Sequence, residues 1–146
     1  MFPEYLIPYI AYVAALVICG VAIWQGDRPL KASALVLVLA WAFTPVLMGR
    51  DREILNYPIT IIDSCTALIL VWISLRWRRV WSAVLAALTI LIVVVPFVHL
   101  SDPGIHKYNR YAANNILSHF QLVVIAVATW LVIRDRRRAD EGVLRS

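Results

Sequence analysis

The sequence predicts an all-α membrane protein: a five-transmembrane-helix bundle with short loops and no soluble domain. Three observations support this prediction. Of the 146 residues, 62% are hydrophobic and only 16% are charged, whereas about a quarter of the residues of a soluble domain are charged. The charged residues cluster between long uncharged segments. Each of these segments approaches the ~20 apolar residues that a helix needs to cross a bilayer.

The five predicted spans follow the apolar segments of the chain. They cover approximately residues 5–24, 31–48, 57–75, 80–100 and 112–133. Residues 25–29 form a turn, and Pro29 suits the first position of the helix that follows. We expect a single polytopic membrane domain over residues 1–133. A basic cytoplasmic tail over residues 134–146 follows it, and its polar, charged composition predicts a frayed segment.

The distribution of basic residues predicts the orientation of the chain in the membrane. With the N-terminus outside, ten basic residues lie on the inner side and four on the outer side. The inner set is Arg28, Lys31, Arg76, Arg78, Arg79, Arg134, Arg136, Arg137, Arg138 and Arg145. Because cytoplasmic connections are enriched in Lys and Arg, we predict an outer N-terminus and a cytoplasmic C-terminus. The compact chain and its arginine-rich inner side favour a bacterial cytoplasmic (inner) membrane.

A tight basic turn between the third and fourth spans anchors this orientation. Arg76, Arg78 and Arg79 lie beside Trp77 and Trp81, and tryptophan rings prefer the level of the lipid headgroups. We expect these five residues to act as topology anchors. The net charge of +5 arises from such clusters at the ends of apolar segments. It does not indicate a basic face for nucleic acid, which is therefore not an expected partner.

Polar residues collect in the outer halves of the third and fifth spans, where each needs a partner or water. At 1.5 Å per residue, Asp63 lies ~8–9 Å from the outer end of its span and His119 lies ~9–10 Å from the outer end of its own. The face of the third span that carries Asp63 also carries Thr66, Ala67 and Leu70. The complete predicted cluster is Asp63, Thr66, His99, Asn114, Asn115, Ser118, His119 and Gln121.

The polar residues of the fifth span form two adjoining stripes. Asn114, Ser118 and Gln121 share one stripe, and Asn115 and His119 share the other. A functional interpretation makes the cluster a hydrated outer vestibule or ligand pocket, with Asp63 and His119 as a coupled titrating pair. A structural interpretation, favoured because the polar residues become scarce toward the inner side, is a hydrogen-bond network holding spans three and five together. Such interhelical bonds contribute ~0.6–2 kcal/mol each.

The sequence favours a non-enzymatic function. It contains no G-x-S-x-G, H-E-x-x-H or phosphate-binding-loop motif. We predict a small membrane protein that acts by intramembrane helix packing, as an accessory or scaffold subunit or as a homo-oligomer. Its partners are the lipid bilayer and a second protein or a second copy. The alternative is an oligomeric channel, pore or proton-linked transporter that uses Asp63 and His119.

A further alternative is a small haem-binding electron-transfer subunit. Two histidines from neighbouring helices can ligate haem iron, and His99 and His119 are the available pair. Their depths differ by much of a helical turn, so the primary prediction is a protein without a cofactor. No C-x-x-C or zinc-type spacing occurs, so no metal site is expected. Cys19 and Cys65 both fall inside predicted spans and are interpreted as small core residues.

Overall fold

The computed structural model describes residues 6–47, 57–101 and 107–143, and all the regular secondary structure in these ranges is helical. The five helices are α1 (Leu6–Gln25), α2 (Arg28–Leu47), α3 (Tyr57–Trp77), α4 (Val80–Ser101) and α5 (Lys107–Val143). The prediction of an all-α fold with five helices is confirmed for this part of the chain.

Three of the helices contain segments that are long and apolar enough to cross a membrane. These segments are Tyr57–Trp77, Val80–Val98 and Ala112–Glu141. A shorter apolar segment, Tyr12–Gln25, lies in α1. The helices also expose many large apolar side chains, which suits contact with hydrocarbon better than contact with water. These features support the prediction of a membrane protein.

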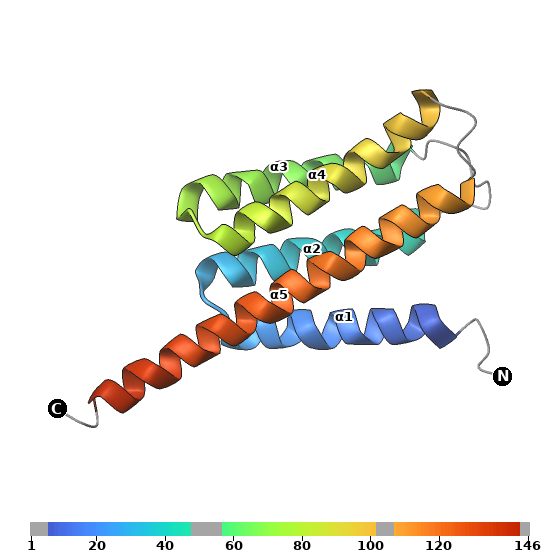
Figure 1. Cartoon of the computed structure of the whole chain (residues 1–146). Coiled ribbons are helices and arrows are strands. Elements are labelled where there is room, and N and C mark those ends of the chain that lie inside the picture. Colours follow the sequence, from blue (N-terminus) through green and yellow to red (C-terminus); the bar gives the residue numbers. More distant parts are fainter. Residues whose placement is uncertain (1–5, 48–56, 102–106, 144–146) are drawn as a thin grey trace.

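The helices pack as a closed ring in which α5 lies between α1 and α4 (Figure 1). The other neighbouring pairs are α1–α2, α2–α3 and α3–α4, and α2 also contacts α5. Figure 1 shows the α1–α2 and α3–α4 turns at one end of the bundle, where the C-terminal part of α5 projects beyond the other helices. We call this end the basic end, and its basic residues are Arg28, Lys31, Arg76, Arg78, Arg79, Arg134, Arg136, Arg137 and Arg138.

α5 extends beyond the predicted fifth span at both ends. It contains 37 residues, from Lys107 to Val143, whereas the span predicted from the sequence covers only residues 112–133. The prediction of a frayed tail is therefore wrong for residues 134–143, which are helical. Arginine, alanine and glutamate favour helix, and the preceding helix supplies the nucleus that a short isolated segment lacks.

The core of the bundle combines small and large side chains. On α1, Ala15, Cys19 and Ala22 form a buried stripe, and such small residues allow neighbouring helices to approach closely. Toward the basic end the interior is filled by larger buried side chains, which are Leu30, Leu70, Ile73, Leu85 and Ile125. The interior near the basic end is therefore well packed.

The two cysteines have different environments. Cys19 is buried, as predicted, whereas Cys65 is exposed, so its interpretation as a core residue is wrong. The buried side of α3 carries Thr66, Leu70 and Ile73, and Cys65 lies outside this stripe. An apolar surface in contact with lipid accepts a small thiol as readily as the core does, so membership of an apolar span does not predict burial.

Candidate functional site

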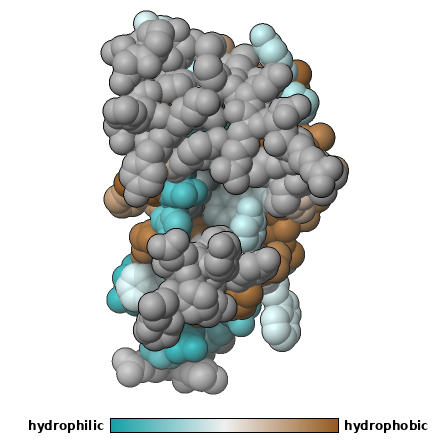
Figure 2. Space-filling model, turned by 90° about the vertical axis from the view of Figure 1, so that its right-hand side faces the viewer, coloured by the Kyte–Doolittle hydropathy of each residue, from teal (hydrophilic) through white to brown (hydrophobic). Residues whose placement is uncertain are grey.

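The polar residues in the first half of α5 fall on two faces of the helix. Gln121 is buried and Asn114 and Ser118 are half-buried, whereas Asn115 and His119 are exposed. The first three residues share the stripe that faces the interior of the ring. Figure 2 looks onto the end opposite the basic end and shows hydrophilic side chains near the middle of that face. The predicted cluster is therefore divided between the interior and the surface of the bundle.

Gln121 joins α5 to α4 through a hydrogen bond in the buried interior. Its Nε2 donates to Oγ1 of Thr89 at 2.8 Å, and the two residues are 1% and 3% exposed. The Thr89 hydroxyl donates in turn to the carbonyl oxygen of Leu85 at 2.8 Å. Within the described residues, Gln121 Oε1 has no hydrogen-bond partner. The Gln121 side chain is thus both an interhelical link and a source of an unpaired buried acceptor.

His119 presents one ring nitrogen at the surface of the bundle. Its Nδ1 lies within hydrogen-bond distance of the carbonyl oxygen of Asn115. Because a carbonyl oxygen only accepts, this bond places a proton on Nδ1, and in the neutral imidazole Nε2 is then an acceptor. The side chain is exposed, so this acceptor can be reached by a donor from outside the bundle.

Asp63 lies on the inward stripe of α3 but does not meet His119. It is half-buried, and Thr66, Ala67 and Leu70 on the same face are buried. α3 packs mainly against α4 and α2, whereas α5 packs mainly against α4 and α1. Among the described residues, no ion pair or hydrogen bond joins the Asp63 side chain to His119 or to another group. The expected network between the third and fifth helices is therefore not formed there.

The haem hypothesis requires His99 as well as His119. His99 belongs to α4, but its side chain lies outside the described part of the structure. Where side chains are described, no group of three or more His, Cys, Asp or Glu residues is placed to hold a metal ion.

The predicted anchor residues surround the α3–α4 turn. α3 ends at Trp77 and α4 begins at Val80. The two tryptophans are half-buried and the three arginines are exposed, and together these anchors are Arg76, Trp77, Arg78, Arg79 and Trp81. Half-buried indole rings beside exposed guanidinium groups are the arrangement expected at the level of the lipid headgroups.

Asp27 links the α1–α2 turn to the α3–α4 turn. Its Oδ1 accepts a hydrogen bond from the backbone N–H of Leu30 at 3.3 Å, so Asp27 is the N-cap of α2. Its Oδ2 lies 3.8 Å from a guanidinium nitrogen of Arg79. The Ser82 hydroxyl donates to the carbonyl oxygen of Arg79 at 2.7 Å. One carboxylate therefore caps a helix and holds the two turns near each other.

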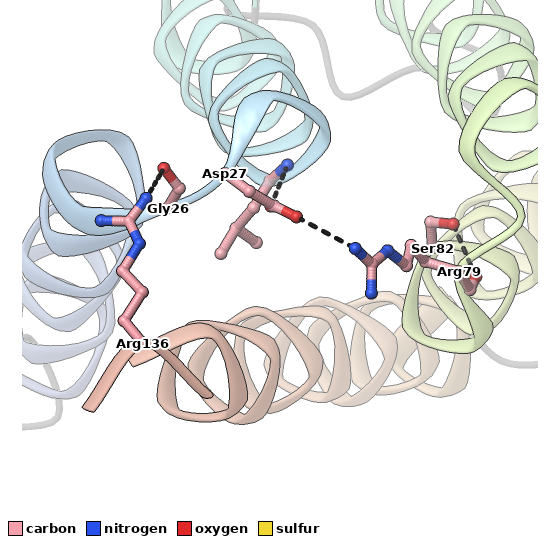
Figure 3. Close-up of polar contacts among 6 residues, drawn as sticks. Gly26, Asp27, Arg79, Ser82 and Arg136 are labelled. Atoms are coloured by element: carbon pink, nitrogen blue, oxygen red, sulfur yellow. Dashed lines mark hydrogen bonds and ion pairs between the residues drawn. The ribbon is translucent and has the colours of Figure 1, made fainter. Parts of the chain in front are cut away.

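Arg136 connects the extension of α5 to the same region. A guanidinium nitrogen of Arg136 donates to the carbonyl oxygen of Gly26 at 3.5 Å (Figure 3). A Cβ atom at Gly26 would lie 2.2 Å from the carbonyl oxygen of Ala22, so this tight turn requires glycine. Figure 3 shows how these contacts bring together the α1–α2 turn, the α3–α4 turn and α5.

Four residues that complete these contacts were not predicted from the sequence, namely Thr89, Asp27, Ser82 and Arg136. Thr89 is the single polar residue between Ala83 and Val98, and a lone hydroxyl at that depth is itself a signal of helix–helix contact. Asp27 directly precedes Arg28 and Pro29, which is a helix-start pattern. Arg136 gave no comparable signal, because its partner is a backbone carbonyl.

Five packed helices, of which three are long and apolar enough to cross a membrane, define the class as an all-helical membrane protein. Comparison with known proteins finds no family model, curated protein or solved structure that matches this chain. We therefore infer its function from its own residues.

Proposed function

We propose that the chain is a non-enzymatic integral membrane protein that acts by helix packing within the bilayer, as an accessory or scaffold subunit or as a homo-oligomer. The observation that carries this proposal is the exposed polar pair Asn115 and His119 on α5. Both side chains lie on the surface of the bundle and not in its interior, so this pair is left for a neighbour.

In this proposal all five helices cross the membrane. α1 and α2 each contain 20 residues, which corresponds to about 30 Å and matches the hydrocarbon core of a bilayer. Figure 1 shows them running beside the three longer apolar helices between the two ends of the bundle. The basic end faces the cytoplasm of a bacterial inner membrane, and the N-terminus lies outside.

The position of His119 makes its exposure unfavourable in lipid alone. The apolar segment of α5 begins at Ala112, and His119 follows it by about 10 Å along the helix axis. Polar side chains at such depths usually face protein or a water-filled cavity, because hydrocarbon offers them no hydrogen bonds. A donor from a neighbouring helix would pair with the Nε2 acceptor.

The same side of α5 carries an apolar seam suited to a partner helix. Its members are exposed and recur at alternating intervals of four and three residues, and they are Ile116, Phe120, Val123, Val127 and Trp130. This spacing is the heptad pattern through which two helices pack side by side. Lipid can cover the apolar seam, whereas a protein neighbour covers the seam and also offers hydrogen-bond partners to the polar pair.

A second copy of the chain offers complementary groups. Two copies inserted in the same direction place Asn115 of one copy within about a helical turn of the depth of His119 in the other. The asparagine amide can donate to Nε2 of the opposite histidine, and two-fold symmetry makes this bond twice. A different subunit would need only one donor at this depth.

We expect His119→Leu to weaken association about ten-fold or more, because two interhelical bonds of roughly 0.6–1.7 kcal/mol each are lost. Ser118→Ala is the matched control, since Ser118 is adjacent in sequence but lies on the inward stripe.

Energy transfer between donor- and acceptor-labelled copies in liposomes measures the association as lipid is added. The intact mass in mild detergent identifies the partner. A monomer without any partner, or unchanged association of His119→Leu, contradicts the proposal.

Asp63 supports a second candidate function, proton-linked transport. The carboxyl group is half-buried and has no hydrogen-bond or ion-pair partner among the described residues. It is therefore free to bind and release a proton. The large buried side chains near the basic end, such as Leu70 and Ile125, oppose an open pore through one copy. Transport would require a second conformation or an oligomer.

For this candidate we expect Asp63→Asn to abolish proton-coupled flux in liposomes, because the amide cannot titrate. Ser64→Ala is the control, since the Ser64 hydroxyl only donates to the Thr60 carbonyl oxygen at 2.7 Å on its own helix. A pH-sensitive dye inside the vesicles records the flux. Absence of flux in the parent protein, or equal flux in both variants, eliminates transport through Asp63.

A further inference from the structure

We propose that the α3–α4 turn binds the headgroup of an anionic phospholipid through Arg76, Arg78 and Arg79, which we call the arginine turn. This role goes beyond the proposed function and depends only on the chain lying in a membrane. Guanidinium groups bind phosphate oxygens through paired hydrogen bonds. All three side chains of the arginine turn are exposed.

Helix-end contacts fix the backbone of the arginine turn. The N–H of Arg78 donates to the carbonyl oxygen of Ser74 at 2.8 Å, which closes the last turn of α3. The carbonyl oxygen of Arg79 accepts the hydroxyl of Ser82 at 2.7 Å, which closes the first turn of α4. Three positive charges are thus held within four residues on a defined backbone.

The arginine turn keeps an excess of positive charge. Its single carboxylate neighbour among the described residues is Asp27, which lies 3.8 Å from Arg79 and also accepts the Leu30 N–H. No ion pair to Arg76 or Arg78 occurs in the ranges that the structure describes. Repulsion among these charges decreases when an anion binds between them.

Arg78 occupies a backbone conformation that favours glycine. Its φ angle is +48°, in the left-handed region at the end of a helix, where glycine is the usual residue. In this region the Cβ atom of any other residue lies too close to the following carbonyl oxygen, and the backbone is strained. The chain therefore places a guanidinium group at a position where glycine would relieve strain, and a charge-dependent contact provides a physical reason for it.

An apolar stripe beside the arginine turn distinguishes a lipid from a soluble anion. Ile61, Leu68, Trp72 and Leu75 are exposed on one side of α3, and this stripe ends beside Arg76. Trp72 packs edge-on against Trp77 with ring centroids 5.9 Å apart. A phospholipid fits this surface, because its phosphate reaches the arginines while an acyl chain lies along the stripe. A soluble phosphate uses only the arginines.

The test compares lipid retention by native mass spectrometry after release from nanodiscs of mixed phosphatidylcholine and phosphatidylglycerol. We expect the monomer to retain phosphatidylglycerol preferentially. Arg78→Gly should reduce this preference about five-fold, and Arg76→Gln should act similarly, since a basic residue near an anionic surface has an effect of this size. Arg78→Lys should reduce the preference less than Arg78→Gly does, because it keeps the charge but loses the paired hydrogen bonds of the guanidinium group.

Arg137→Gln is the matched control, because Arg137 is exposed on α5 outside the arginine turn and its substitution changes the net charge equally. We expect it to reduce the preference less than two-fold. The proposal is overturned if Arg137→Gln acts as strongly as Arg78→Gly, or if phosphatidylglycerol and phosphatidylcholine are retained equally. Displacement of the lipid by inorganic phosphate would instead identify a soluble-anion site. Because nanodiscs are symmetric and monomers are scored separately, the result depends on neither orientation nor association.

Discussion

Replacement of Ile125 by alanine is expected to lower the free energy of unfolding by about 2 kcal/mol. Ile125 is 0% exposed in the interior of the bundle. A residue transferred from lipid to a protein core gains little from the hydrophobic effect, so the loss comes from the cavity. At ~24 cal/mol per Å³ of cavity, removal of three carbon atoms gives this value. Reversible unfolding in mixed micelles measures the change.

Ile90→Ala is the control for this experiment, because it removes the same three carbon atoms. Ile90 lies on α4 and is 45% exposed, so surrounding lipid or detergent fills the space that truncation leaves. We expect a change below about 0.5 kcal/mol. Equal effects of the two substitutions would show that Ile125 does not pack inside the bundle.

Substitution of Thr89 by valine is expected to destabilise the bundle by about 1–3 kcal/mol, because the buried Gln121 amide loses its partner. Gln121→Leu should destabilise the bundle less than Thr89→Val does, since it also removes the unpaired Oε1 acceptor. The Thr89 hydroxyl then still donates to Leu85. The double substitution Thr89→Val with Gln121→Leu should recover most of the loss, because it leaves two apolar groups in contact.

The double-mutant cycle distinguishes this hydrogen bond from general packing. Unfolding free energies of the parent, the two single variants and the double variant give the coupling between Thr89 and Gln121. A double variant that is less stable than Thr89→Val alone would mean that the two side chains contribute independently. In that case the bond does not hold α4 to α5.

The positions of the helices could be predicted from the sequence, because an apolar segment bounded by charges is a one-dimensional feature. The predicted third span, residues 57–75, corresponds closely to α3 (Tyr57–Trp77). The predicted fourth span, residues 80–100, agrees equally well with α4 (Val80–Ser101). α5 was predicted too short, because hydropathy reports the extent of the apolar segment and not the extent of the helix. Residues 134–143, which lie beyond the predicted span, are also helical.

The composition of the candidate site depended on information that the sequence does not contain. Periodicity placed Gln121 and His119 on different stripes, but it could not determine which stripe faces the core. The order of helices around the ring was also undetermined. The prediction paired Asp63 with His119 across the third and fifth helices, whereas α5 packs against α4 and its buried amide pairs with Thr89. The sequence therefore did not predict which stripe of α5 is buried or which helix α5 packs against.

The position of α5 between α1 and α4 has a consequence for biosynthesis. Of the five helices, α5 is the last to be made, and it packs against the first. When the ribosome has released only α1 to α4, the ring is open between α1 and α4, and Thr89 lacks its Gln121 donor. The pairs α1–α2, α2–α3 and α3–α4 can pack as they are made. The ring closes only when the final helix joins the two ends of this four-helix arc.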